Sequence, residues 1–216
     1  MKNVVLLNWG MKGGIFMNFT ITIAREYGSG GRFIAAKVAE KLGIPFFDKT
    51  LLMDEAANIG INPLDMEKFD DEESAFYFPM MNNSKFLDLE LSQKSYMASL
   101  KTIQMVASTK SSVIVGRCAD YILSDDLDTV LRVFIYAPLA SKIKRGQKYF
   151  GLPKSKEECK KIILNNDKKR KKYYDFITDK EWGNPECYDI MINSDIGIEA
   201  SVDAIVSAAK IKFGLE

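Results

Sequence analysis

The sequence predicts an α/β fold built on a parallel β-sheet. Residues 19–48 contain an apolar strand pattern, a glycine-rich turn, an amphipathic helical pattern and a second strand pattern, in that order. This order is that of a β-α-β unit, whose two strands run parallel. Further apolar runs at 112–116 and 130–136 are typical of strands that are buried on both faces of such a sheet.

Each element of the first unit follows from its residue types. Residues 19–24 are apolar and β-branched, which favours a strand. From Ile34 to Leu42 apolar residues recur on one helical face, and Gly43 is typical of the residue that ends a helix. Residues 44–48 are expected to form a second, shorter strand.

The middle of the chain, residues 49–110, predicts helices and no strand. Helical patterns cover 51–59 and 87–108, and the segment 69–84 between them is acidic at first, then aromatic and loop-like. We therefore expect a helical insertion between two strands of the sheet.

The C-terminal third predicts basic helices, a last strand and a final helix. Residues 139–174 are helical in pattern and rich in lysine and arginine, with a break at 151–153. Residues 188–193 are expected to form the last strand. Ser194 or Asp195 is expected to cap the final helix, because both residue types accept hydrogen bonds from helix N-terminal amides.

The length of 216 residues suits one domain with a sizeable core and is short for two. We expect residues 1–216 to form a single domain. Residues 1–16 are interpreted as an N-terminal extension before a second possible start at Met17, with an added edge strand at 4–7 as the alternative.

Composition excludes several classes of function. The formal net charge is +1, so no global field attracts nucleic acid or a membrane surface, and no apolar run approaches the length of a membrane span. Three scattered cysteines fit a reducing compartment, and we expect a cytoplasmic protein.

The chain has no histidine, which excludes histidine-based triads and zinc sites. Phosphoryl transfer is the main reaction class that runs on lysine, arginine, carboxylates and backbone amides.

The glycine-rich turn predicts an anion-binding site. Between the first strand and the first helix stand four small residues: Gly28, Ser29, Gly30 and Gly31. Such a turn aims consecutive N–H groups into one concavity, and the helix dipole adds to the attraction for phosphate. Arg25 and Arg32 flank the turn and can supply full positive charges.

Two other interpretations of this turn stay open. A dinucleotide site would need glycine or alanine where Phe33 stands, although Asp48 lies at a suitable distance for its acidic residue. We favour the phosphate loop because Phe33 would obstruct close helix–strand packing. The other alternative is a glycine turn with no ligand. The turn also departs from the Walker A pattern, because Arg25 stands at its first glycine and Gly31 at its lysine.

Several motifs, taken together, resemble the cytidylate kinase-like family. They lie at residues 21–32, 43–49, 113–120, 131–138, 167–174, 182–183 and 188–189. The resemblance extends from about Met17 to the C-terminal helix. It implies a three-layer P-loop kinase fold with a parallel sheet, in which 49–110 would be a helical acceptor-binding insertion and 139–174 a basic helical lid.

The resemblance also implies an activity and its residues. The enzyme would use ATP and Mg²⁺ to phosphorylate a nucleoside monophosphate, CMP or dCMP, with nucleotides rather than nucleic acid or membrane as partners. The ATP phosphates would be held by Arg25, Gly28, Ser29, Gly30, Gly31 and Arg32. The acceptor would be bound by Asp48, Lys49 and Arg117. Catalysis would depend on Arg32, Arg117, Asp167 and Arg170. No side chain is assigned as a metal ligand.

Most of these residues also have a structural interpretation. Arg117 follows a buried strand and could instead pair with Asp120. Asp48 could hold magnesium through water or cap the next helix. Most lysines of 168–172 fit a solvated helix face, and this run lacks the aromatic pattern typical of nucleic-acid binding.

Some charged positions of cytidylate kinases differ in this chain. Lys49 begins the segment where those kinases have a Ser-Gly or Thr-Gly pair, Asp54 stands near their next arginine, and no arginine directly precedes Asp167. An active kinase therefore requires compensation, for which Arg25 and Arg32 are the candidates. The alternative is a nucleotide-binding module without phosphoryl transfer, or a kinase of another small acceptor.

Overall fold

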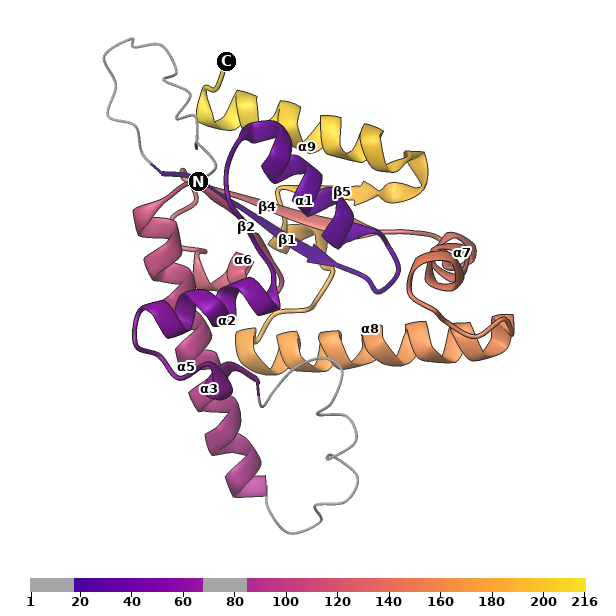
Figure 1. The fold of residues 1–216 in the computed structure, drawn as a ribbon, viewed down its shortest axis with the longest axis horizontal. Coiled ribbons are helices and arrows are strands. Elements are labelled where there is room, and N and C mark those ends of the chain that lie inside the picture. Colours follow the sequence, from indigo (N-terminus) through magenta and orange to yellow (C-terminus); the bar gives the residue numbers. More distant parts are fainter. Residues whose placement is uncertain (1–17, 68–84) are drawn as a thin grey trace, which may run out of the picture.

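A computed structural model of the chain describes residues 18–67 and 85–216. Its centre is a five-stranded sheet in the order β2-β3-β1-β4-β5, and every pair of neighbouring strands is parallel. Figure 1 shows helices α1 and α9 on one side of the sheet and α2, α5 and α8 on the other. The predicted parallel sheet and its helical layers are therefore confirmed.

The strands are β1 Thr20–Arg25, β2 Phe46–Phe47, β3 Ser112–Val115, β4 Val130–Tyr136 and β5 Ile190–Asn193. The helices are α1 Gly31–Leu42, α2 Lys49–Asn58, α3 Pro63–Glu67, α5 Lys85–Thr109, α6 Ala119–Ile122, α7 Leu139–Tyr149, α8 Lys156–Thr178 and α9 Ile198–Phe213. Two short 3₁₀ turns cover Pro185–Cys187 and Ser194–Ile196.

The core is divided between the two faces of the sheet because successive strand residues point to opposite faces. Val113 and Val115 of β3 pack in the cluster formed with α1 and α9. Ile114, between them, packs in a second cluster with α2, α5 and α6. The apolar face predicted for the final helix is buried, including Val202 and Ile205.

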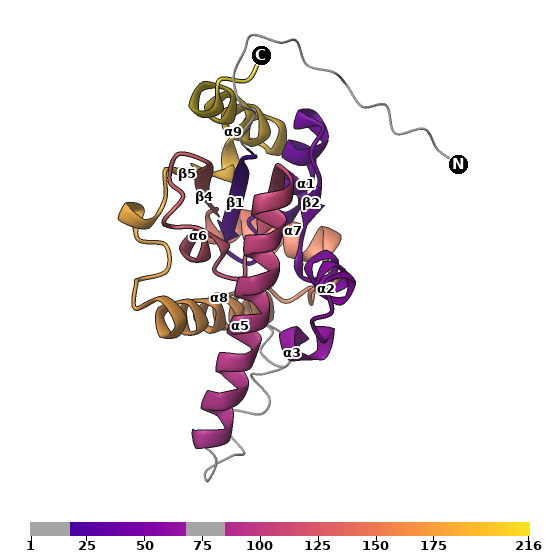
Figure 2. The same ribbon diagram turned by 90° about the vertical axis from the view of Figure 1, so that its left-hand side faces the viewer.

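Helices occupy the described part of the insertion, as predicted. Helix α5 packs against both α2 and α3, and Figure 2 shows it extending beyond the sheet. The loop expected at 69–84 lies outside the described residues, as do the N-terminal extension and the alternative strand at 4–7. Within the described ranges, no helix combines the length and apolar character needed to cross a membrane.

The ends of three elements differ from prediction. Strand β2 is only Phe46–Phe47, and β5 begins at Ile190 rather than at residue 188. The predicted helix cap at Ser194 or Asp195 is wrong, because α9 begins after Gly197. The Ser194 side chain is buried and donates a hydrogen bond to the Ser29 carbonyl instead, at 2.6 Å.

Candidate functional site

The glycine-rich turn joins the carboxyl end of β1 to the first residue of α1. Gly28 and Gly30 have φ angles of 75° and 84°, in the left-handed region that favours glycine. A Cβ on Gly28 would lie 3.1 Å from the Lys142 carbonyl oxygen, so α7 approaches the turn closely. Gly30 caps α1 without a side-chain hydrogen bond. The turn therefore presents a helix N-terminus of the kind that binds anions.

Ser29 anchors the turn to distant parts of the chain. Its side chain is buried and donates to the Glu26 carbonyl oxygen at 2.8 Å. Its own carbonyl oxygen accepts from Ser194 at 2.6 Å and from Arg145 Nη1 at 3.2 Å. The turn is thus tied to α7 and to the segment between β5 and α9.

A buried lysine links the turn to both basic helices. Lys142 of α7 is 5% exposed, and its Nζ lies 2.8 Å from Asp167 Oδ2 and 3.1 Å from Glu26 Oε2. Asp167 of α8 also accepts a hydrogen bond from the backbone N–H of Tyr27, at 2.6 Å. A carboxylate therefore already binds one amide of the turn.

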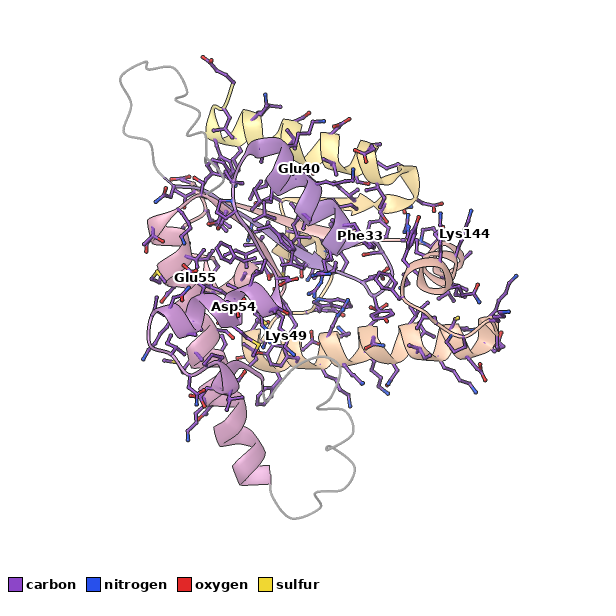
Figure 3. The ribbon with its side chains drawn as sticks, in the orientation of Figure 1. Phe33, Glu40, Lys49, Asp54, Glu55 and Lys144 are labelled. Atoms are coloured by element: carbon purple, nitrogen blue, oxygen red, sulfur yellow. The ribbon has the colours of Figure 1, made fainter. Side chains whose placement is uncertain are left out.

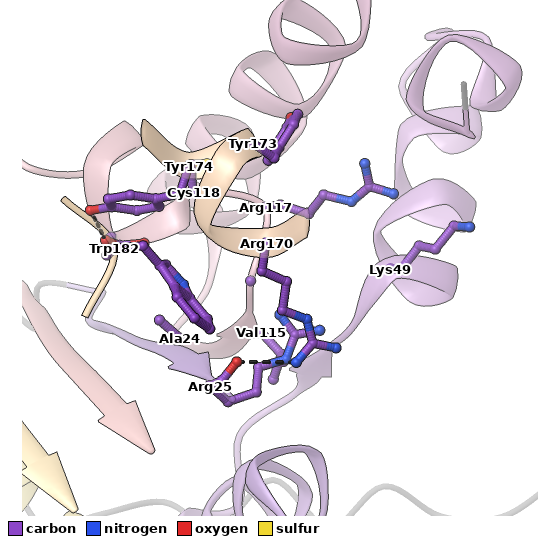
Figure 4. A pocket seen from close by; sticks show the side chains of 12 residues that line it. Ala24, Arg25, Lys49, Val115, Arg117, Cys118, Arg170, Tyr173, Tyr174 and Trp182 are labelled. Carbon is purple, nitrogen blue, oxygen red and sulfur yellow. Dashed lines mark hydrogen bonds between the residues drawn. The ribbon is translucent and has the colours of Figure 1, made fainter. Parts of the chain in front are cut away.

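Basic side chains from four segments line one cavity beside the turn, which we call the arginine pocket (Figure 4). They are Arg25, Lys49, Arg117 and Arg170. Arg170 also donates to the Arg25 carbonyl oxygen at 3.1 Å. The volume is about 50 Å³, room for a few water molecules. Several cations around one small space favour an anion there.

A buried carboxylate forms part of the wall of the arginine pocket. Asp120 accepts a hydrogen bond from the Tyr174 hydroxyl at 2.6 Å. Burial raises the pKa of Asp120 above its usual range, and the Tyr174 hydrogen bond offsets only part of this effect. Burial and the neighbouring carboxylate raise the pKa of Tyr174, which therefore stays protonated.

A second, larger cavity lies between α1, α7 and the start of α9, and we call it the aromatic pocket. Its volume is about 610 Å³, within the range of small-molecule sites. Phe33, Tyr149 and Phe150 line it, with ring centroids 6.0 Å apart in both pairs made by Phe33. Figure 3 shows Phe33 and Lys144 next to each other on this side of the molecule.

The structure separates the predicted site residues into three groups. Arg25, Lys49, Arg117 and Arg170 meet in the arginine pocket. Asp167 of α8 contacts the turn, where it accepts a hydrogen bond from the Tyr27 N–H. Arg32 instead turns away: its guanidinium bonds to Asp48 at 2.6 Å, and its side chain is 70% exposed. Asp48 in addition caps α2 through the Leu51 N–H, which matches one of the two roles considered for it.

Sequence reasoning missed the aromatic pocket and the residues that anchor the turn. Lys142 and Arg145 lie in the basic segment, but nothing in their spacing distinguishes them from the exposed lysines around them. Phe33 was considered only as an obstacle to packing, whereas it is 47% exposed. An exposed phenylalanine directly after a phosphate loop is the signal that could have indicated a ligand surface.

The sequence profile of the cytidylate kinase-like family matches residues 20–196. This chain belongs to that family. A comparison with curated protein sequences finds no match.

The solved structures that resemble this member of the cytidylate kinase-like family include kinases. A protein of uncharacterised function from Eubacterium ventriosum is similar, with TM-score 0.66, 28% identity, and 88% of this chain and 98% of that one covered. A shikimate kinase from Bacteroides thetaiotaomicron has a TM-score of 0.53 and 17% identity, and the match covers 89% of this chain and 98% of that one. A sugar kinase from a Janibacter species has a TM-score of 0.50 and 12% identity, and the match covers 92% of this chain and 98% of that one. The fold is that of the P-loop kinases, as predicted.

Proposed function

We propose that this chain is a kinase that transfers the γ-phosphoryl group of ATP to a nucleoside monophosphate, with CMP and dCMP as the first candidates. One observation carries the proposal: four cations from separate segments surround a small cavity beside a phosphate-type loop. Guanidinium and ammonium groups gathered around one space raise the local positive potential, which attracts an anion such as a phosphate. The family resemblance supplies the nucleotide as that anion.

The donor nucleotide is proposed to lie across the turn. Gly30 both caps α1 and lines the aromatic pocket, so a ligand that fills this pocket reaches the helix N-terminus directly. The exposed rings of Phe33, Tyr149 and Phe150 offer stacking surfaces for a base. Lys144 and Lys148, on the same rim, add positive charge for phosphates.

The acceptor is proposed to bring its phosphate to the arginine pocket. Arg117 and Arg170 would hold its oxygens, because guanidinium groups suit bidentate phosphate binding. Lys49 lies on the α2 side of the same space. Catalysis of phosphoryl transfer consists mainly of such positioning and charge compensation. Asp167 would act as a positioning residue, through Lys142 and the Tyr27 amide.

Magnesium is proposed to arrive with the nucleotide rather than to occupy a site built by the protein. Among the described residues, no group of three or more acidic or cysteine side chains is placed to hold a metal. The carboxylates nearest the turn already bind other groups: Glu26 and Asp167 share Lys142, and Asp48 pairs with Arg32. These residues do not fit direct coordination, and the ion would be held by ATP phosphates and water.

The test is a coupled assay with ATP and Mg²⁺ against a panel of nucleoside monophosphates. We expect turnover on a cytidine nucleotide and a loss of about 10²–10³-fold in Arg117→Ala, typical of removing one charge that stabilises a transition state. Lys101→Ala, an exposed change on α5, serves as the control and should leave turnover intact. ATP binding without turnover on any member of the panel would reject the nucleotide acceptor, and unchanged turnover in Arg117→Ala would reject the site.

A further inference from the structure

The Walker A lysine is missing from the turn, and the structure indicates what takes its place. In the standard pattern the first position is glycine and the seventh is lysine. This chain has Arg25 at the first and Gly31 at the seventh, which exchanges the two residue types. A side chain at position 25 can replace one at position 31 only if the two positions occupy the same space.

The two positions do share one space. A Cβ added to Gly31 would lie 2.6 Å from the Cβ of Arg25 and 3.0 Å from its Cγ. Real Cβ atoms do not approach other atoms so closely, so only one of the two residues can carry a side chain here. Gly31 is the first residue of α1 and does not have a positive φ, so its backbone accepts any side chain. The Arg25 stem, rather than backbone strain, requires glycine at position 31.

The other end of Arg25 lies over a second glycine, Gly116, whose φ of 72° itself favours glycine. A Cβ on Gly116, just after β3, would lie 2.2 Å from Arg25 Nη1. The arginine therefore leaves the turn beside Gly31, passes over Gly116 and places its guanidinium in the arginine pocket. Figure 4 shows the guanidinium groups of Arg25 and Arg170 directed into the same region.

We propose that Arg25 is the catalytic cation that replaces the Walker lysine, reaching the transferring phosphoryl group from the start of the turn instead of from its end. The inference deepens the kinase function proposed above and rests on it. An arginine in this place carries a fixed charge and a planar set of donors, so it can contact the γ-phosphate and the acceptor oxygens together.

Nucleotide affinity tests the role of the charge. Calorimetric titration with MgATP and MgADP compares the wild type with Arg25→Ala. We expect Arg25→Ala to weaken MgATP binding roughly ten- to hundredfold, the usual effect of a lost hydrogen bond to a charged group, and to change MgADP binding much less. In the double variant Arg25→Gly/Gly31→Lys the two residue types return to their standard positions without a Cβ at position 25, and MgATP affinity should recover most of the loss.

A stability cycle tests the shared space without any ligand. Gly31→Ala should lower the free energy of unfolding clearly in the wild type, where it meets the Arg25 Cβ, and have much less effect in the Arg25→Gly background, which lacks this atom. Equal costs in the two backgrounds would overturn the shared space, whether or not the lysine variant folds.

The two failures are distinguishable. If the wild type binds MgATP and Arg25→Ala binds it equally well, the role of Arg25 is overturned while the kinase proposal stands. If the wild type binds neither nucleotide, the proposed function fails and takes the catalytic role of Arg25 with it, and the stability cycle still decides the geometry.

Discussion

At the scale of single residues, the buried Asp120 makes the free energy of unfolding depend on pH, which no local sequence motif predicts. Because burial raises its pKa, the folded state binds this proton more tightly than the unfolded chain does. The free energy of unfolding must then fall as pH rises from the unfolded value, about 3.9, toward the raised folded value. Asp120→Asn cannot ionise and can still accept the Tyr174 hydrogen bond.

We therefore predict that Asp120→Asn removes this part of the pH dependence and is more stable than the wild type at neutral pH. Urea unfolding across a pH series from acid to neutral measures both effects. Tyr174→Phe is the matched control: it leaves the carboxylate buried without its donor and should cost about 1–3 kcal/mol at neutral pH. Parallel pH profiles for Asp120→Asn and the wild type would refute the assignment.

The same scale shows what a sequence can predict about a site. The glycines of the turn and the arginine after β3 were predictable, because strand–turn–helix order and the carboxyl edge of a parallel sheet are local or topological features. The contact of Arg32 with Asp48 was not, because its direction depends on how α2 lies beside α1. Ser194 shows the same limit, because its partner Ser29 lies 165 positions away.

At the scale of elements, one buried lysine joins the α7 and α8 helices to the turn, beside the contacts that Arg145 and Asp167 make with its backbone. Removing the Lys142 charge leaves the Glu26 and Asp167 carboxylates without the cation that they share, and with only backbone N–H donors. Breaking a largely buried ion pair from one side typically costs about 3–5 kcal/mol. We predict a loss of this order for Lys142→Met, with faster hydrogen exchange in α8 and at the Tyr27 amide.

The control for this variant is Lys144→Met, an exposed lysine on the same helix. It should change stability by less than about 0.5 kcal/mol, as exposed substitutions usually do. Neutralising both partners as well, with Glu26→Gln and Asp167→Asn, should recover much of the stability lost in Lys142→Met. A triple variant as unstable as the single one would show that packing, not charge, holds the helices.

Elements were predicted better than their ends. Helices α1, α5 and α9 follow apolar periodicity that their own sequences contain, and each was expected within a few residues of where it lies. Strand β2 is shorter than its apolar run, because it pairs with β3 at only two positions. Strand length here depends on the partner, which the local pattern does not describe.

At the scale of the whole molecule, the two pockets draw residues from segments spread along the chain, between Ala24 and Glu199. The arginine pocket combines β1, α2, the segment after β3 and α8, and the aromatic pocket combines α1, α7 and α9. A ligand that occupies both pockets should therefore stabilise the folded state as a whole and not only one loop.

This coupling gives a prediction for thermal unfolding. A ligand that binds only the folded state at one hundred times its dissociation constant stabilises it by about 2.7 kcal/mol. For a chain of this size we expect MgATP to raise the unfolding midpoint by roughly 5–10 °C, and MgATP with CMP to raise it further. Arg117→Ala should keep the first increase and lose the second, because its side chain belongs to the arginine pocket alone. Loss of both increases in that variant would mean that the two pockets form a single site.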